Sequence, residues 1–279
     1  MNKLKVYRHE YLEYDYTREE IPEQSQFFMH IHTEMEVYYL IEGRVEYHVE
    51  NSVYLPQPGD VMIMRSGEAH TSLADRSGPY ERFNLRFAPE LLAGTPHSKL
   101  LLPFLERPLG VFNHYKAGQI PSEYIRACFG RMFAKEIPRS QERSIHYLLP
   151  ILQELYDVWV TRENKPEDPP ASMPAQIISY INHHLLQLQS PQQISDTFYL
   201  SQSQLYRIFR EYTGTSIWDY VRTKRLFAAR DRLFSGTAPH EAAAICGFSE
   251  YSTFFRAYKK QFGHSPKEDF GAGKSSASI

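Results

Sequence analysis

Residues 200–210 read LSQSQLYRIFR and residues 246–263 read CGFSEYSTFFRAYKKQFG, and the two stretches follow one plan. Each places a turn containing serine before a segment whose apolar residues recur three and four positions apart, which predicts an amphipathic helix. Glycine follows as a stop signal, Gly214 after the first helix and Gly263 after the second. A shorter helical pattern precedes each turn. The chain is therefore predicted to contain two helix-turn-helix units.

The helix before the first turn begins at Pro191, which suits the first turn of a helix, and the helix before the second turn covers residues 240–246. Residues 216–234 carry an apolar stripe at helical spacing and are predicted to form a helix that connects the units. At about 1.5 Å per residue this connector is about 28 Å long. Such a connector would hold the two units near one turn of DNA apart, about 34 Å.

Basic, polar and aromatic side chains face outward from the second helix of each unit. Side chains of these types contact base edges and phosphates in the major groove of DNA. The alternative is that the helices only pack and that their basic residues form a solvated face, but two units at this spacing favour DNA binding. The candidates for DNA contact are Gln202, Ser203, Tyr206, Arg207, Arg210, Tyr251, Ser252, Arg256, Lys259 and Lys260.

Residues 174–270 resemble the AraC family of bacterial transcription regulators, through the two stretches quoted above and Arg225-Leu226 of the connector. The resemblance implies a homodimer that binds double-stranded DNA and that, if it is an activator, contacts RNA polymerase. The base-reading positions it implies are Ser203, Tyr206, Arg207, Tyr251, Ser252, Phe255 and Arg256. Three departures from the family's usual residues predict altered packing in the second unit: Pro239, Ala242 and Asp269-Phe270.

Charge and composition agree with this interpretation. Residues 173–279 hold 12 Lys and Arg against 8 Asp and Glu, a balance of +4, whereas residues 1–172 hold 19 against 25, a balance of −6. The basic excess thus falls on the half predicted to contact phosphates. A length of 279 residues predicts about two domains. No apolar run approaches the roughly 18 residues of a membrane span. The N-terminus has no apolar signal-peptide core, so we expect a cytoplasmic protein with no membrane partner, whose Cys128 and Cys246 are buried and reduced.

The N-terminal half is predicted to form short strands. Residues 35–41 are aromatic and β-branched, and the alternation of residues 45–49 with polar neighbours predicts that the two segments form a hairpin. Further strands are expected at residues 53–55, 61–64 and 82–87. Short strands separated by Gly, Pro and Asn are typical of a small β-barrel or jelly roll.

Residues 25–88 resemble the cupin barrels, through His30, His32, Glu36 and Gly43 in a first motif and Gly59, Gly67 and His70 in a second. His30 and His32, two apart on a predicted strand, would project to the same face. With Glu36 and His70 they form a set that suits a divalent transition metal. Arg65 and Ala74 replace the usual proline and asparagine of the second motif. The same four residues could instead contact an effector, or only hydrogen-bond inside the barrel.

The strand at residues 82–87 alternates apolar and polar residues, and its polar face is directed either into the barrel mouth or to solvent. If it faces inward, it offers donors to hydroxyls or a carboxylate. Tyr47 and Tyr54 could add stacking faces for a sugar. The candidate effector-binding residues are His30, His32, Glu36, Tyr38, His70, Arg82, Asn84 and Arg86.

Two helices are predicted to follow the barrel, at residues 121–137 and 141–161, the second carrying a long apolar stripe and an expected kink at Pro150. The stripe either packs back on the barrel or mediates self-association, and the AraC resemblance favours self-association. The stripe residues are Ile145, Leu148, Leu152, Leu155 and Trp159. Residues 162–174 are polar and rich in proline, which is typical of a domain linker.

The predicted fold class is a two-domain α+β protein. The expected parts are a cupin-like barrel (1–108), connecting helices (109–161), a linker (162–174) and an all-α DNA-binding domain with two helix-turn-helix units (175–279). The predicted function is a sequence-specific transcription regulator controlled by a small-molecule effector, with a sugar expected from the family and no catalytic residues. The alternative is a metal-dependent cupin enzyme or a metal sensor joined to a DNA-binding domain.

Overall fold

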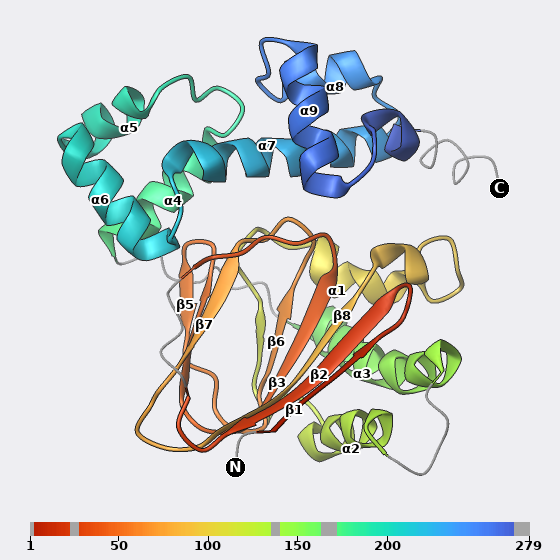
Figure 1. The fold of residues 1–279 in the computed structure, drawn as a ribbon. Coiled ribbons are helices and arrows are strands. Elements are labelled where there is room, and N and C mark those ends of the chain that lie inside the picture. Colours follow the sequence, from red (N-terminus) through yellow and green to blue (C-terminus); the bar gives the residue numbers. More distant parts are fainter. Residues whose placement is uncertain (1–2, 23–27, 135–139, 163–171, 271–279) are drawn as a thin grey trace. The chain divides into compact units, whose positions relative to one another are not determined.

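The computed structural model describes residues 3–22, 28–134, 140–162 and 172–270, in two units, Met1–Pro169 and Pro170–Ile279 (Figure 1). The strands are β1 (Lys3–Arg8), β2 (Leu12–Glu19), β3 (Met35–Glu42), β4 (Val45–Val49), β5 (Ser52–Tyr54), β6 (Val61–Met64), β7 (His70–Ala74), β8 (Tyr80–Phe87) and β9 (His114–Tyr115). The helices are η1 (Pro89–Leu91), η2 (Ser98–Leu101), α1 (Leu102–Leu105), α2 (Ser122–Met132), α3 (Gln141–Thr161), α4 (Met173–His183), α5 (Pro191–Phe198), α6 (Gln202–Thr213), α7 (Ile217–Phe234), α8 (Pro239–Ile245) and α9 (Tyr251–Phe262).

A β-rich N-terminal unit followed by an all-helical unit confirms the predicted α+β class. Helix α4 begins at Met173, so the expected linker overlaps its first residues, and residues 163–171 lie outside the described part of the chain. Among the helices of the described residues, none is both long enough and apolar enough to cross a membrane.

Within the described residues the strands form two antiparallel sheets, in the orders β1-β2-β8-β3-β6-β9 and β5-β4-β7. One face of the larger sheet is covered by α2 and α3 (Figure 1), and a core that includes Val37, Leu85 and Phe129 lies between them. The other face is directed toward the smaller sheet, with Tyr38 and Tyr47 in the core between the two sheets. This second core is the interior of the barrel.

The predicted hairpin between residues 35–41 and 45–49 is wrong. Strand β3 pairs with β6 and β8, whereas β4 pairs with β5 and β7, so the chain crosses from one sheet to the other near Gly43. Gly43 has a φ of +111°, and a Cβ there would lie 2.7 Å from the carbonyl oxygen of Pro79. Alternation identifies a strand but does not specify its partner, which contacts distant in sequence decide.

The structure places His30 and His32 differently from the sequence-based prediction. His30 and His32 precede β3 rather than lying on it, since β3 begins at Met35. His30 forms an isolated antiparallel bridge with His70, and each backbone N–H donates to the other residue's carbonyl. The bridge brings the segment before β3 against β7.

The helix predicted at residues 141–161 is present as α3 and continues through Pro150. Its apolar stripe packs back on the sheet, because Leu148, Leu152 and Leu155 are fully buried in the core of the N-terminal unit. These three leucines are therefore unavailable to a partner copy, which corrects their assignment to self-association. Ile145 and Trp159, near the two ends of the stripe, are only half-buried.

The helix boundaries predicted for the C-terminal unit are close to those observed. Ser201 caps α6, because its side chain accepts a hydrogen bond from the backbone N–H of Gln204. The Gln204 side-chain oxygen in turn accepts a hydrogen bond from the backbone N–H of Ser201. Gly214 and Gly263 end α6 and α9 in the left-handed conformation, with φ of 73° and 82°. Tyr199 occupies the same conformation between α5 and α6, with a φ of 53°.

Residues at the positions that depart from the family pattern make their own local contacts. The Asp269 carboxylate accepts hydrogen bonds from the Tyr258 hydroxyl and from the Arg230 Nε at 3.1 Å, so it joins α9 to α7. Ala242 is fully buried in a core with Phe254. The second unit is thus packed through these contacts at two of the positions where the sequence departs from the family's usual residues.

Arg225 of α7 ties three segments of the C-terminal unit together. Its guanidinium donates to the carbonyl oxygens of Leu185, Leu188 and Gly247, with the Leu185 bond at 3.0 Å and the Gly247 bond at 3.2 Å. Gly247 has a φ of +80°, and a Cβ there would lie 2.8 Å from the Arg225 Cζ. The turn of the second helix-turn-helix unit is therefore built around this arginine.

Glu68 and Arg107 form an ion pair in the N-terminal unit, and both side chains have no exposed surface. The guanidinium donates to both carboxylate oxygens, at 2.7 and 2.6 Å. Glu68 also accepts from the backbone N–H groups of Gly110 and Arg65. Burial alone would raise the pKa of Glu68, but Arg107 and these N–H groups outweigh it and lower the pKa to about 2.

Removing one partner of this pair is expected to cost much more than removing both charges. Arg107→Met leaves a buried unpaired carboxylate and should lower the free energy of unfolding of the N-terminal unit by about 3–5 kcal/mol. The double variant Glu68→Gln/Arg107→Met should lose less, because its amide oxygen still accepts hydrogen bonds. Urea unfolding followed by Trp159 fluorescence in a Trp218→Phe background measures both. Equal losses in the single and double variants would contradict the prediction.

Arg225→Ala is expected to destabilise the C-terminal unit by about 2–3 kcal/mol, because three carbonyls lose their charged donor and two of these hydrogen bonds are partly buried. Arg222→Ala is the matched control, since Arg222 lies on the same helix, is exposed and pairs across one turn with Asp219. Trp218 fluorescence in a Trp159→Phe background reports the unfolding. Similar stabilities for the two variants would show that Arg225 does not hold the segments together.

Candidate functional site

The outward face of α6 presents the side chains predicted from the sequence. Gln202, Ser203, Tyr206, Arg207 and Arg210 are all exposed, while Leu205 and Phe209 on the opposite face are buried. The alternation follows from the helical period, because apolar positions three and four apart face the core. The face is therefore free to contact a flat or grooved polar surface.

Helix α9 presents a similar face. Ser252, Arg256, Lys259 and Lys260 are exposed, and Phe255 is 37% exposed. Tyr251 is the exception, because it is half-buried and its ring stacks on His240 at 3.7 Å between centroids, with 11° between planes. Much of the Tyr251 ring thus supports the junction of α8 and α9.

Helix α7 joins the two faces within the C-terminal unit. Figure 1 shows α6 beside one end of α7 and α9 beside the other. Helix α7 packs in a common core with α8 and α9 through Leu226, Ala229 and Leu233. At its other end, the ring of Tyr220 contacts the ring of Phe209 of α6 edge-to-face, with 5.6 Å between the ring centroids. The connecting helix is therefore packed against both units.

The register of β3 and β8 decides which way the polar face of β8 is directed. Glu36 lies opposite Arg86, and Tyr38 lies opposite Asn84. Residues opposite one another on paired strands share a face, and Tyr38 belongs to the core between the sheets. Arg82, two residues from Asn84, shares this face, so the polar side of β8 is directed into the barrel.

The neighbouring strand β2 supplies carboxylates to this wall. Arg82 donates to the Asp15 carboxylate at 2.6 Å, and Arg86 pairs with Glu13. Sequence reasoning did not find these acids, although residues 12–17 alternate apolar and polar side chains in the same manner as residues 82–87. Among the described residues, Asn84 Oδ1 is buried without a hydrogen-bond partner. The inner wall is thus polar, and one of its acceptors is unsatisfied.

The interior beyond this wall is filled largely by side chains. Tyr38 and Tyr80 hydrogen-bond through their hydroxyls at 3.1 Å, and Tyr54 donates to the Gly110 carbonyl oxygen at 2.7 Å. A pocket of about 160 Å³ lies beside Arg86 and Glu13 and is bounded by residues 8–13. Tyr54, expected as a stacking face, instead anchors the segment after α1.

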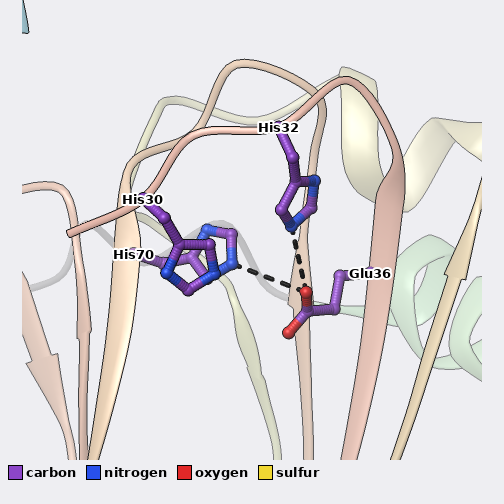
Figure 2. A group of neighbouring side chains, drawn as sticks. All are labelled: His30, His32, Glu36 and His70. Carbon is purple, nitrogen blue, oxygen red and sulfur yellow. Dashed lines mark hydrogen bonds and ion pairs between the residues drawn. The ribbon is translucent and has the colours of Figure 1, made fainter. Parts of the chain in front are cut away.

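His30, His32, Glu36 and His70 converge at the end of the barrel, as Figure 2 shows. One potential ligand atom from each residue lies within 4.8 Å of the others. The Glu36 Oε2 is 3.0 Å from His32 Nε2 and 3.5 Å from His70 Nε2. The Tyr47 hydroxyl donates to the second oxygen, Oε1, at 3.0 Å.

The charges of this cluster depend on one another. Burial alone would raise the pKa of Glu36, but attraction to His70 and hydrogen bonds with His32 and His70 hold it well below its usual range. Burial alone would lower the pKa of His70, yet Glu36 raises it. Desolvation and repulsion from His70 lower the pKa of His30, although much of that residue's surface is exposed. The negatively charged Glu36 carboxylate therefore favours a positive charge on the groups that surround it in the cluster.

Comparisons with known proteins match both units. A family model described as the AraC-like ligand binding domain matches residues 16–147, and one described as a helix-turn-helix domain matches residues 194–270. The probable transcriptional regulator LumQ of Photobacterium leiognathi is 35% identical over 91 residues, which are 32% of this chain and 37% of LumQ. The match therefore spans about a third of LumQ.

Two further comparisons cover most of the chain. The HTH-type transcriptional activator RhaS of Yersinia pseudotuberculosis serotype I (strain IP32953) is 24% identical over 255 residues, which are 88% of this chain and 89% of RhaS. A solved structure of ToxT from Vibrio cholerae covers 94% of this chain and 98% of ToxT, at 11% identity and a TM-score of 0.40.

Proposed function

Because the chain belongs to the AraC family of DNA-binding transcription regulators, a non-enzymatic family, we propose that a small polar molecule bound in its N-terminal unit controls how it binds DNA. The observation that carries the proposal is the polar inner wall of the barrel. It combines two paired arginines with the unsatisfied buried oxygen of Asn84. Buried polar groups are rarely left unpaired, so such an atom favours a ligand that donates to it.

The chemistry of the wall suits a ligand with hydroxyl or carboxylate groups. Arg82 and Arg86 can donate through their remaining N–H groups, and Glu13 and Asp15 can accept from hydroxyls. A sugar or a small hydroxy acid carries both kinds of group. The pocket beside Arg86, at about 160 Å³, is smaller than the roughly 300–1,000 Å³ of pockets for drug-sized ligands. Of the residues proposed for effector contact, Arg86 lines this pocket. We infer a small effector at the barrel mouth, contacting some of His30, His32, Glu36, Tyr38, His70, Arg82, Asn84 and Arg86.

Base recognition is proposed for the exposed residues of α6 and α9. Arg207 and Arg256 are the strongest candidates, because an arginine fork matches the acceptors of guanine in the major groove. Ser203, Tyr206, Ser252 and Phe255 lie on the same faces, and Lys259 and Lys260 suit phosphates. Tyr251 contributes less than its neighbours in this scheme, since its ring is stacked on His240.

Control of transcription is proposed to act through a homodimer. Two units per chain and two chains per dimer would recognise paired half-sites, each covering two successive major grooves. Such a dimer would use surfaces other than the buried leucines of α3, and an activator would also contact RNA polymerase. The effector can change DNA binding only if it binds two arrangements of the protein unequally.

Arg207→Ala/Arg256→Ala is expected to lower affinity at least about 30-fold for a duplex that the wild-type chain selects from a random library, since each base contact contributes about 1–3 kcal/mol. The matched control is Arg126→Ala/Arg131→Ala, which removes two exposed arginines from α2. Fluorescence anisotropy with selected and scrambled duplexes measures both. A double variant that folds and still prefers the selected duplex would overturn the base-contact assignment.

A thermal-shift screen of the full chain against sugars and organic acids is expected to identify compounds that stabilise the N-terminal unit. A ligand at 100 times its dissociation constant adds about 2.7 kcal/mol to the native state. Asn84→Leu should remove the shift, whereas Glu123→Gln, an exposed change on α2, should preserve it. The proposal fails if Asn84→Leu responds like wild type, or if a stabilising compound leaves DNA affinity unchanged.

A further inference from the structure

We propose that Gln192 of α5 holds the side chain of Gln202 so that the Gln202 amide reads adenine in the major groove. The inference rests on the base recognition proposed above for α6, and it names both the base and the residue that positions the reading amide. Gln202 is the first residue of α6, and the N-terminal residues of a recognition helix are those that reach base edges.

Two hydrogen bonds in series connect α5 to this side chain. The Gln202 Nε2 donates to the Gln192 Oε1 at 2.7 Å, and the Gln192 Nε2 donates to the Asp196 Oδ1 at 2.6 Å. All three residues are exposed, so the series lies on the surface of the unit and not in its core. Gln192 and Asp196 are four residues apart on α5 and therefore neighbours on one face of that helix.

The carboxylate decides the direction of both amides. An ionised carboxylate only accepts hydrogen bonds, so Gln192 directs its Nε2 at Asp196 and its Oε1 at Gln202. Gln202 must then offer its Nε2 to Gln192, because two carbonyl oxygens would repel each other. Its Oε1 and its second amide N–H are the groups that it can direct at DNA. An acceptor beside a donor matches the N6–H and N7 of adenine, the base that a glutamine contacts with both amide groups.

The opposite orientation of the amide would read a different base. A Gln202 amide with Oε1 directed at Gln192 would leave only its N–H groups for DNA. Guanine presents two acceptors in the major groove, N7 and O6, so it would suit that orientation. By fixing the amide through Gln192, Asp196 therefore favours adenine over guanine without touching either base.

The second helix-turn-helix unit has a contact between the same two positions. Both α5 and α8 begin with proline, and the second residue is Gln192 in α5 and His240 in α8. Both recognition helices begin with the residue that is contacted, Gln202 in α6 and Tyr251 in α9. In the second unit the contact is the stacking of the His240 ring on the Tyr251 ring. The chemistry differs while the positions agree, which favours a shared role in orienting the first residue of each recognition helix.

The test is selection of duplexes from a random library by the full chain, followed by fluorescence anisotropy on duplexes with single base changes. Gln202→Ala identifies the position that Gln202 reads, and adenine is expected there in the wild-type site. Gln192→Ala should lower discrimination against the other bases at that position by about 5-fold or more and leave the other positions unchanged. Gln176→Ala is the matched control, because Gln176 is an exposed glutamine of α4, and it should keep every preference.

Two further variants separate positioning from stability. Adding Gln192→Ala to Gln202→Ala should change no preference further, because Gln192 acts through Gln202. Asp196→Asn can donate as well as accept, so it no longer fixes the amides and should weaken the preference for adenine over guanine at the same position. All of these side chains are exposed, so each variant is expected to melt at the wild-type temperature.

An unchanged preference in Gln192→Ala would overturn the positioning role, as would a further loss in the double variant. A base other than adenine at the position lost in Gln202→Ala would overturn the assigned base, and the loss of no position would overturn both. A wild-type chain that selects no sequence would instead contradict base recognition by α6 and α9, and the positioning role with it. Failure of the inference alone is therefore distinguishable from failure of the proposed DNA recognition.

Discussion

The buried ion pair between Glu68 and Arg107 is the interaction on which the N-terminal unit depends most. A charge without exposed surface is tolerated only when it is paired and hydrogen-bonded, so the segments that carry these residues have one acceptable arrangement. Arg107 also donates to the carbonyl oxygens of Pro103 and Val111, which fixes the path of the chain after α1. Glu68 fixes the turn before β7, and the same residue's carbonyl orients His70. The geometry of the imidazole cluster is therefore a consequence of a salt bridge that takes no part in it.

The C-terminal unit uses the same principle with less burial. Arg225 satisfies carbonyls from the end of α4 and from the Gly247 turn, and Asp269 satisfies Arg230 and Tyr258. In both cases a polar side chain joins separate elements of the C-terminal unit. Small helical units have limited cores, so a few well-paired polar groups decide their internal geometry. This explains how the substitutions at Asp269 and Ala242 are accommodated without loss of the helix-turn-helix arrangement.

Much of the C-terminal unit was predictable because its signals are local. A helix that starts at Ser201 and ends at Gly214 is specified by residues within a few positions of each end. The barrel was predictable only as a set of strands. Nothing near Gly43 indicates that β3 and β4 belong to different sheets, and Glu68 and Arg107 lie 39 residues apart in the sequence. The imidazole cluster was found by motif, yet its tautomers follow from backbone carbonyls that no motif records. Asp15 and Glu13 could have been found, since their strand alternates as clearly as β8.

Strand β3 links the interior of the barrel to the helices outside it. Its even-numbered residues Glu36 and Tyr38 face the cluster and the polar wall, and its odd-numbered residues Val37 and Tyr39 lie in the core with α2 and α3. Because successive side chains of a strand point to opposite faces, a displacement of β3 moves both sets together. Packed cores have few empty spaces, so the helices must respond to such a displacement rather than absorb it. A force that draws Glu36 inward would therefore be transmitted through β3 to the packed face that contacts α3. The alternation of side chains along β3 places polar groups inside the barrel. The same alternation connects these groups to the helices on the other face of the sheet.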